Sequence, residues 1–284
     1  MAKIDVILCA YNSENTLFEC VDSILSQSFS DFNLFIFNDC STDNTALIAD
    51  KFHDKRVKIL NSKKNVGTYA GKNFILKNFV SSKYVALHDA DDISYPDRFK
   101  IQFEFMEKNE DVACTGSSIR EFWTDIEPHT DCSTLGSSER VNFYPPTLSR
   151  SSLLNIADTL SHSGNYDDFL KLKLCMNGSV MLRSSVLKKY GGWDGMTRIA
   201  ADSDLFIRIL SHHRIVNLED TLYSRRFHKD SLTASKHTGI NSKIRKMYNQ
   251  SRRFIFERSS RGIRQIEKMI CPELEMVEVK CAEY

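Results

Sequence analysis

Strand-like and helix-like segments alternate four times between residues 4 and 106, and this alternation restricts the fold more than any other feature. Apolar, β-rich runs at 4–9, 34–37, 57–60 and 84–87 are each followed by apolar residues at helical spacing. Strand, turn and helix repeated in this way are typical of a mostly parallel sheet with helices on both faces. We therefore predict an α/β fold with helices over 13–25, 42–48, 68–79 and 97–106.

Composition narrows the class of protein. The 284 residues are 42% hydrophobic and 26% charged, as in a soluble globular protein with a full core. The 38 Lys and Arg residues balance the 37 Asp and Glu residues, so no overall field favours nucleic acid as a partner. The eight cysteines contain no C-x-x-C pair, which argues against zinc and for a reducing compartment.

Neither a signal-peptide pattern nor an apolar run long enough to cross a bilayer is present. We therefore expect a cytoplasmic protein, which could also sit peripherally at the inner face of the plasma membrane. Residues 240–269 are predicted to form a long helix rich in Lys and Arg. Its basic side chains could contact an anionic lipid surface. Its apolar side chains could equally dock on the main domain or on a second copy of the chain.

Polar or conformationally special residues follow the predicted strands. Tyr11 and Asn12 follow the first, Asp39 follows the second and Gly67 follows the third. In open α/β sheets, ligands bind outside the carboxyl ends of the strands. We therefore expect these residues along one rim of the sheet.

The fourth predicted strand ends in three carboxylates within four positions, namely Asp89, Asp91 and Asp92. Acids this close repel one another unless a positive group lies among them. Mg2+ and Mn2+ are hard cations that prefer carboxylate oxygens and commonly carry a phosphate. The alternative interpretation is a solvated acidic turn that caps the following helix.

Beyond a strand predicted at 112–115, residues 121–175 lose clear periodicity and are rich in Ser, Thr, Asp and Asn. We interpret them as a variable insertion or acceptor region. Order returns at 178–182, and a helix is predicted at 202–210. The predicted organisation is a catalytic domain over 1–235 and a C-terminal helical extension over 236–284.

Six short motifs occur in one order along the chain. They are Cys9-Ala10-Tyr11-Asn12, Asn38-Asp39-Cys40-Ser41-Thr42-Asp43, Asn65-Val66-Gly67, Asp89-Ala90-Asp91-Asp92, Pro96-Asp97-Arg98 with Gln102, and Gly191-Gly192-Trp193-Asp194 followed by Ala201-Asp202-Ser203-Asp204. Together they resemble a family 2 glycosyltransferase of GT-A fold, a Rossmann-like architecture. The resemblance implies transfer of a sugar from a nucleotide diphosphate donor, with inversion at the anomeric carbon and with the help of Mn2+ or Mg2+.

The resemblance also assigns the donor site. It assigns contacts with a uridine-type nucleotide to Ala10, Tyr11, Asn12 and Asp39. It gives the diphosphate to Gly67 and to Lys72, which stands where the family usually has Arg and so lacks bidentate geometry.

The remaining assignments concern the metal and the sugar. Asp91 and Asp92 would bind the metal, and Asp89 would lie on the nucleotide or beside the metal. Trp193 resembles the aromatic residue that lines the sugar site. A tryptophan beside two glycines is also typical of a core residue.

Inversion needs a base that removes the proton of the acceptor hydroxyl. In the family this base is the Asp of a Glu-Asp pair at a helix start, which implies Asp202 here. Ala201 stands in the place of the glutamate. Asp204 would lie on nearly the opposite side of the helix, so only one of the two acids can face the cleft.

We therefore expect a glycosyltransferase with a nucleotide-sugar donor, most simply a UDP-sugar, and a glycan or lipid-linked acceptor in surface polysaccharide biosynthesis. The Gln-x-x-Arg-Trp signature of processive synthases is absent, which favours single additions. One rival is a sugar nucleotidyltransferase, but the loop after the first strand is not a glycine-rich phosphate loop. The other rival is a catalytically silent sugar- or nucleotide-binding module. This alternative stays open because Ala201 and Lys72 depart from the family pattern.

Overall fold

The computed structural model describes residues 2–124, 139–152, 174–195, 201–228, 231 and 243, and the backbone of 276–281. Within these ranges, eleven strands form one sheet in the order β11-β3-β2-β1-β4-β9-β6-β10-β5, with β7 paired to β6 and β8 to β10. The strands are β1 (Ile4–Ala10), β2 (Phe32–Asn38), β3 (Val57–Ser62), β4 (Tyr84–Asp89), β5 (Ile93–Ser94), β6 (Val112–Trp123), β7 (Glu139–Asn142), β8 (Thr147–Leu148), β9 (Met181–Arg183), β10 (Arg214–Phe227) and β11 (Met276–Cys281).

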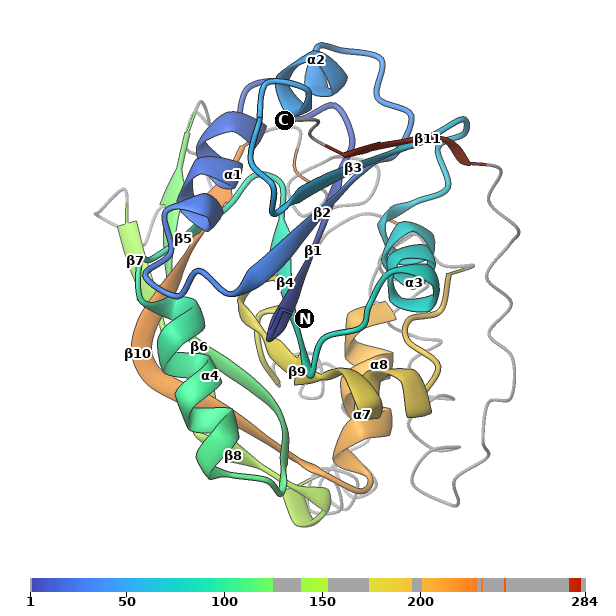
Figure 1. The fold of residues 1–284 in the computed structure, drawn as a ribbon. Coiled ribbons are helices and arrows are strands. Elements are labelled where there is room, and N and C mark those ends of the chain that lie inside the picture. The colour runs from blue at the N-terminus through green and yellow to red at the C-terminus, as the bar shows by residue number, and fades with distance from the viewer. Residues whose placement is uncertain are drawn as a thin grey trace.

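Helices cover both faces of this sheet, as the sequence predicts (Figure 1). Strands β3, β2, β1 and β4 are parallel to one another, and each crossover between them carries a helix. The predicted α/β class and mostly parallel core are thus confirmed in this half. The helices are α1 (Leu17–Leu25), α2 (Thr45–Ala49), α3 (Thr68–Asn78), α4 (Arg98–Lys108), α7 (Ser184–Lys189) and α8 (Ala201–Leu210), with a 3-10 turn η2 (Asn177–Ser179).

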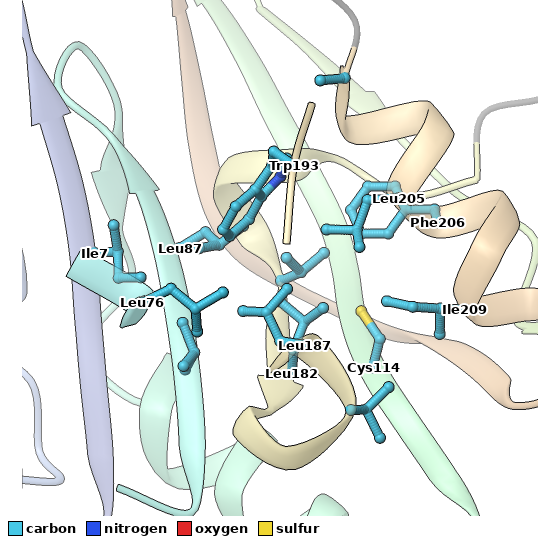
Figure 2. Packing of buried hydrophobic residues seen from close by; sticks show 14 of the residues in the cluster. Ile7, Leu76, Leu87, Cys114, Leu182, Leu187, Trp193, Leu205, Phe206 and Ile209 are labelled. Atoms are coloured by element: carbon cyan, nitrogen blue, oxygen red, sulfur yellow. The ribbon is translucent and has the colours of Figure 1, made fainter. Parts of the chain in front are cut away.

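Alternation along the strands divides the core into two hydrophobic clusters. On β1, Val6 and Leu8 belong to the cluster under α1, α2 and α4, whereas Ile7 belongs to the cluster under α3, α7 and α8. Both faces of the central strands are therefore buried, which explains their nearly continuous apolar runs. Leu205, Phe206 and Ile209 attach α8 to the second cluster (Figure 2).

The second half of the sheet changes direction. Strand β9 runs antiparallel between β4 and β6, and the long strands β6 and β10 are parallel to each other. The two-residue strand β5, which directly follows the acids, pairs antiparallel with β10. As a result, β10 passes close to the turn that carries Asp89, Asp91 and Asp92.

A buried arginine fixes the strand end that carries these acids. Arg98 has no exposed surface, and its Nη2 donates to the carbonyl oxygens of Leu87, at 2.8 Å, and Val180, at 3.3 Å. Its Nε donates to Gln102, whose Nε2 donates to the carbonyl of Ser179 at 2.8 Å. These bonds join α4 to β4 and to the segment before β9. The motif that contains Arg98 and Gln102 therefore has a structural role.

Three boundaries differ from the prediction. The strand predicted at 112–115 extends to Trp123, and β7 and β8 also lie within the predicted insertion over 121–175. The first helix begins at Leu17, because the carbonyl of Ser13 accepts from the amides of Thr16 and Leu17 in a preceding turn. Strand β11 pairs antiparallel with β3, so part of the predicted helical extension over 236–284 joins the sheet.

Apart from residue 243, the helix predicted over 240–269 lies outside the described residues. Among the helices that are described, none is long and apolar enough to cross a membrane.

Candidate active site

Three loops at the carboxyl ends of β1, β2 and β3 meet on one rim, and we call residues 10–14, 38–45 and 65–67 the nucleotide loops. Asn12 adopts a positive φ of 49°, and its Oδ1 accepts from the amide of Thr42 at 2.9 Å. The amide of Asn12 donates to the hydroxyl of Ser41. Ala10 is buried and its carbonyl accepts from the amide of Asp39, whereas Tyr11 is 49% exposed. The loops therefore hold one another in place and leave the Tyr11 ring accessible.

Asp39 connects the second and third of these loops. It is 3% exposed, and its two carboxylate oxygens accept from the amides of Val66, at 2.7 Å, and Gly67, at 2.8 Å. Gly67 has a φ of 92°, a conformation that favours glycine, and it is the residue from which α3 begins. Asp39 thus fixes the start of α3 as well as lying on the predicted nucleotide rim.

The carboxylates at the end of β4 form the second part of the site, and together with Asp202 we call Asp89, Asp91 and Asp92 the acid corner. Asp92 is 2% exposed and turned inward. The Tyr223 hydroxyl donates to its Oδ2 at 2.8 Å, and the Arg226 amide donates to its Oδ1 at 2.8 Å. Both oxygens of Asp92 are therefore engaged by β10.

Asp91 has different surroundings, with 30% of its side chain exposed. Its Oδ2 lies 3.0 Å from Nε2 of His228, the residue that follows β10. The Arg226 side chain donates to the Asp91 carbonyl at 2.9 Å and pairs with Glu19. The sequence predicts both Asp91 and Asp92 as metal ligands. In the structure the two acids differ, because Asp91 is partly exposed and contacts a histidine, whereas Asp92 is buried and bound by β10.

His228 is the residue that sequence reasoning did not assign. The sequence shows it only within a basic run, Arg225-Arg226-Phe227-His228-Lys229. It lies 137 residues from Asp91 in the chain. A periodic pattern could not reveal this pairing. The signal that could have revealed it is the position of a histidine directly after a long strand.

Lys72 lies inside the protein rather than at the surface of the rim. It is 1% exposed, its Nζ is 3.6 Å from Oδ1 of Asp89, and it lies 5.9 Å from the ring centroids of both Tyr69 and Trp193. Trp193 has no exposed surface and packs among Leu76, Leu87 and Leu205 (Figure 2). Its backbone exchanges two hydrogen bonds with the side chain of Asn73. In this conformation, Lys72 and Trp193 support Asp89 from below.

The two acids of α8 have separate roles, as the helical geometry predicts. Asp204 is 8% exposed and pairs with Arg208 at 2.8 Å. Arg208 also donates to the carbonyls of Tyr190 and Gly192, so this pair fixes the glycine turn before α8. Asp202 instead accepts from the Tyr69 hydroxyl at 3.3 Å. Asp202 is therefore joined to Tyr69 of α3, whereas Asp204 is joined to Arg208 of its own helix.

Crowding and burial perturb these groups. Burial, and then the charges of Asp91 and Asp89, raise the pKa of the Asp92 carboxyl well above its usual range. Removal from water raises the pKa of Asp89, Lys72 lowers it, and among the smaller influences Arg225 lowers it and Asp202 raises it.

His88 is buried, and its Nε2 lies 3.0 Å from the Ser94 hydroxyl. Burial, with a smaller contribution from Arg98, lowers its pKa to about 3. It is a packed neutral residue below the corner.

The donor set of the acid corner fits a hard divalent cation that is completed by phosphate. The described residues contain no group of three or more His, Cys, Asp or Glu side chains arranged to hold a metal. Asp91 and His228 nevertheless form a two-member set in contact, with Asp89 beside them. Mg2+ and Mn2+ at phosphate sites are usually held by one or two protein groups plus phosphate oxygens and water. The corner has this composition.

Comparison with protein families decides the class of the chain. The family model described as glycosyl transferase family 2 matches residues 5–191. This chain belongs to glycosyl transferase family 2. It is a glycosyltransferase enzyme, and it follows that the sugar nucleotidyltransferase alternative is not supported.

Relatives within family 2 agree with this assignment. EpsE of Bacillus subtilis (strain 168), whose name places it among the glycosyltransferases, is 28% identical over 81% of this chain and 74% of its own length. WfgD of Escherichia coli is 31% identical over 37% of this chain and 42% of its own length. Its name describes a UDP-Glc:alpha-D-GlcNAc-diphosphoundecaprenol beta-1,3-glucosyltransferase. The chain thus spans less than half the length of this second relative.

Solved structures confirm the GT-A fold. Residues 1–349 of S. aureus TarS in complex with UDP-GlcNAc match with a TM-score of 0.56 and 20% identity, over 81% of this chain and 60% of that one. The mannosyltransferase PcManGT from Pyrobaculum calidifontis, in complex with GDP-Man and Mn2+, matches with a TM-score of 0.61 and 14% identity, over 92% and 65% of the two chains.

Proposed function

We propose that this family 2 enzyme is a metal-dependent, inverting glycosyltransferase that moves a sugar from a UDP-sugar to a hydroxyl of a glycan or lipid-linked acceptor. The observation that carries the proposal is the acid corner, where Asp91 contacts His228 and Lys72 lies 3.6 Å from Asp89. A silent binding module would have no need for an accessible carboxylate at Asp202.

Asp91 and His228 would hold Mn2+ or Mg2+, with Asp89 beside them. When bound, such a cation stabilises the negative charge that grows on the diphosphate as the bond to the anomeric carbon breaks. Asp92 would support Asp91 through its bonds to Tyr223 and Arg226 rather than bind the metal itself. Lys72 would offset part of the negative charge of the corner, because its ammonium group lies beside Asp89.

The nucleotide loops would hold the uridine diphosphate. The Tyr11 ring is exposed on the rim and could cover the base, while Asn12 and Asp39 keep the surrounding loops in shape. The backbone at Gly67, at the start of α3, would face the diphosphate, where helix amides favour negative charge. Trp193 would act on the sugar site by holding Lys72 and the turn that precedes α8.

Asp202 would accept the proton of the acceptor hydroxyl as it attacks the anomeric carbon. The Tyr69 hydroxyl donates to the carboxylate at 3.3 Å and would keep it in position. Attack from the side opposite the diphosphate inverts the anomeric centre. A lipid-linked acceptor is supported by the relative WfgD, which is named for a diphosphoundecaprenol substrate.

Donor hydrolysis tests this function without a known acceptor. The protein would be incubated with UDP-glucose, UDP-galactose, UDP-N-acetylglucosamine or GDP-mannose, with Mn2+ or with EDTA, and the released nucleoside diphosphate would be measured. We expect release from at least one UDP-sugar in Mn2+, and none in EDTA. Equal release in EDTA would remove the metal from the proposal, and release from GDP-mannose alone would overturn the UDP assignment.

A further inference from the structure

Aromatic side chains at the ends of β6 and β10 form a stack next to the acid corner. Trp123 and Phe227 are register partners, with ring centroids 5.2 Å apart and ring planes inclined by 14°. The guanidinium of Arg225 lies 4.4 Å from the centroid of the Phe227 ring. Phe227 therefore packs against both a guanidinium and an indole, and both Trp123 and Phe227 are partly exposed.

The stack lies on a face of β10 that reaches the acid corner. Side chains alternate along a strand, so Tyr223, Arg225 and Phe227 lie on one face of β10, and Arg226 and His228 lie on the other. Arg226 and His228 contact Asp91. On the other face, the Tyr223 hydroxyl accepts from the amide of Asp89 at 3.2 Å and donates to Asp92 at 2.8 Å. Neighbouring positions of β10 thus place the proposed metal ligand His228 on one face and the aromatic stack on the other.

The polar neighbours of the stack suit a ligand with several hydroxyl groups. Arg225 lies 3.5 Å from the carboxylate of Glu121, its register partner on β6, and the two side chains are 22% and 11% exposed. A guanidinium donates in a planar fork and a carboxylate accepts, so the pair can serve adjacent hydroxyls at once. An indole offers a flat apolar surface that matches the C–H face of a pyranose ring.

We propose that Trp123, supported by Phe227, is the platform of an acceptor subsite that takes a pyranose ring. This inference rests on the proposed function and specifies where its acceptor binds. The C–H face of the acceptor sugar stacks on the indole, and its hydroxyls reach Arg225 and Glu121. This arrangement holds the acceptor on the side of the corner where Asp202 lies. An acyclic polyol has the same hydroxyls but no flat C–H face, and is not bound.

Tryptophan fluorescence tests the subsite directly, because the chain contains two tryptophans, and Trp193 has no exposed surface. The full chain would be titrated with methyl glycosides of glucose, galactose, mannose and N-acetylglucosamine to about 200 mM, with sorbitol as the acyclic control. We expect a saturable emission change with at least one glycoside and none with sorbitol. Phe227→Leu should weaken that glycoside at least tenfold, and Trp123→Leu should abolish the change.

Phe18→Ala is the matched control, because Phe18 is a 57% exposed ring on α1 outside the stack. It should leave the glycoside response unchanged. The proposal is overturned if no glycoside changes the emission, if sorbitol acts like the glycosides, or if Trp123→Leu retains the change. Thermal stabilisation by UDP and Mn2+ is measured on the same samples. If UDP and Mn2+ do not stabilise the protein but the glycoside still changes the emission, the result counts against the proposed donor site. If UDP and Mn2+ stabilise the protein but no glycoside changes the emission, the result counts against the subsite alone.

Discussion

The nucleotide loops and the acid corner lie on the same rim but are held together in different ways. In the loops, acceptors such as Asn12 and Asp39 meet backbone amides, and the contacts are complete within the protein. In the corner, Asp89, Asp91, Asp92 and Asp202 bring like charges together, and the pKa values of Asp89 and Asp92 are raised. The loops are therefore preformed, whereas the proposed cation would stabilise the corner by neutralising its crowded charges.

The largest expected effect separates the two acids of α8. Asp202→Asn should lower turnover by about 10² to 10⁴-fold, because the amide cannot take the acceptor proton. Binding of UDP and Mn2+, followed by thermal shift, should stay intact. Asp204→Asn should instead cost about 3 kcal/mol of stability, because Arg208 is left buried without its carboxylate. An unchanged turnover in Asp202→Asn would remove it as the base.

The next effect separates the acids of the corner itself. At about 100 times Kd, UDP with Mn2+ should stabilise the protein by about 2.7 kcal/mol. Asp91→Asn should abolish this stabilisation, because it removes the exposed carboxylate that contacts His228. Asp92→Asn should retain most of it, because Asp92 is bound to Tyr223 and Arg226. If Asp92→Asn abolishes the stabilisation and Asp91→Asn retains it, Asp92 is the metal ligand instead of Asp91. Denaturant unfolding with and without ligand gives both values.

A smaller effect tests whether the loops are preformed. Asp39→Asn deprives at least one of the amides of Val66 and Gly67 of its acceptor, and should cost about 1 to 3 kcal/mol without any ligand. Tyr11→Ala is the control on the same rim. Since Tyr11 is 49% exposed, this change should alter stability by less than about 0.5 kcal/mol and weaken only UDP binding. Equal stability of wild type and Asp39→Asn in urea would contradict the assignment.

The smallest effect concerns the pH dependence of folding stability that comes from His88. The pKa of His88 is lowered to about 3 by burial, so the unfolded chain binds a proton below pH 6.5 that the folded chain does not. Stability from this residue is present above pH 6.5 and declines as the pH falls. Between pH 6.5 and 5.5 the loss should be about 1 kcal/mol, and His88→Gln should lack that component. A pH dependence that is identical in both proteins would contradict the buried, neutral state of His88.

The sequence predicted local elements well because their causes are local. The predicted helix at 68–79 is α3, Thr68–Asn78, and the apolar run before the acids is β4. Asp202 and Asp204 were separated correctly by helical geometry alone. The positions of Asp39, Gly67 and Asp91 after β2, β3 and β4 follow from the parallel arrangement of these strands.

The sequence could not reveal contacts that depend on distant segments. The pairing of Asp91 with His228 and of Asp92 with Tyr223 requires knowing where β10 lies. Lys72 is charged and follows a loop, which suggested exposure, yet the rings of Tyr69 and Trp193 and the carboxylate of Asp89 bury it. Strands such as β5, with two residues, and β11 have no periodic signal of their own.

The dependence of the corner on β10 has a consequence for biosynthesis. Tyr223, Arg226 and His228 reach back 131 to 137 residues to hold Asp91 and Asp92. On a ribosome, the N-terminal strands emerge and can pair first, while contacts of such high sequence separation form late. A nascent chain that has not yet exposed residue 228 therefore carries its acids without their partners, and the corner is assembled only after β10 has been made.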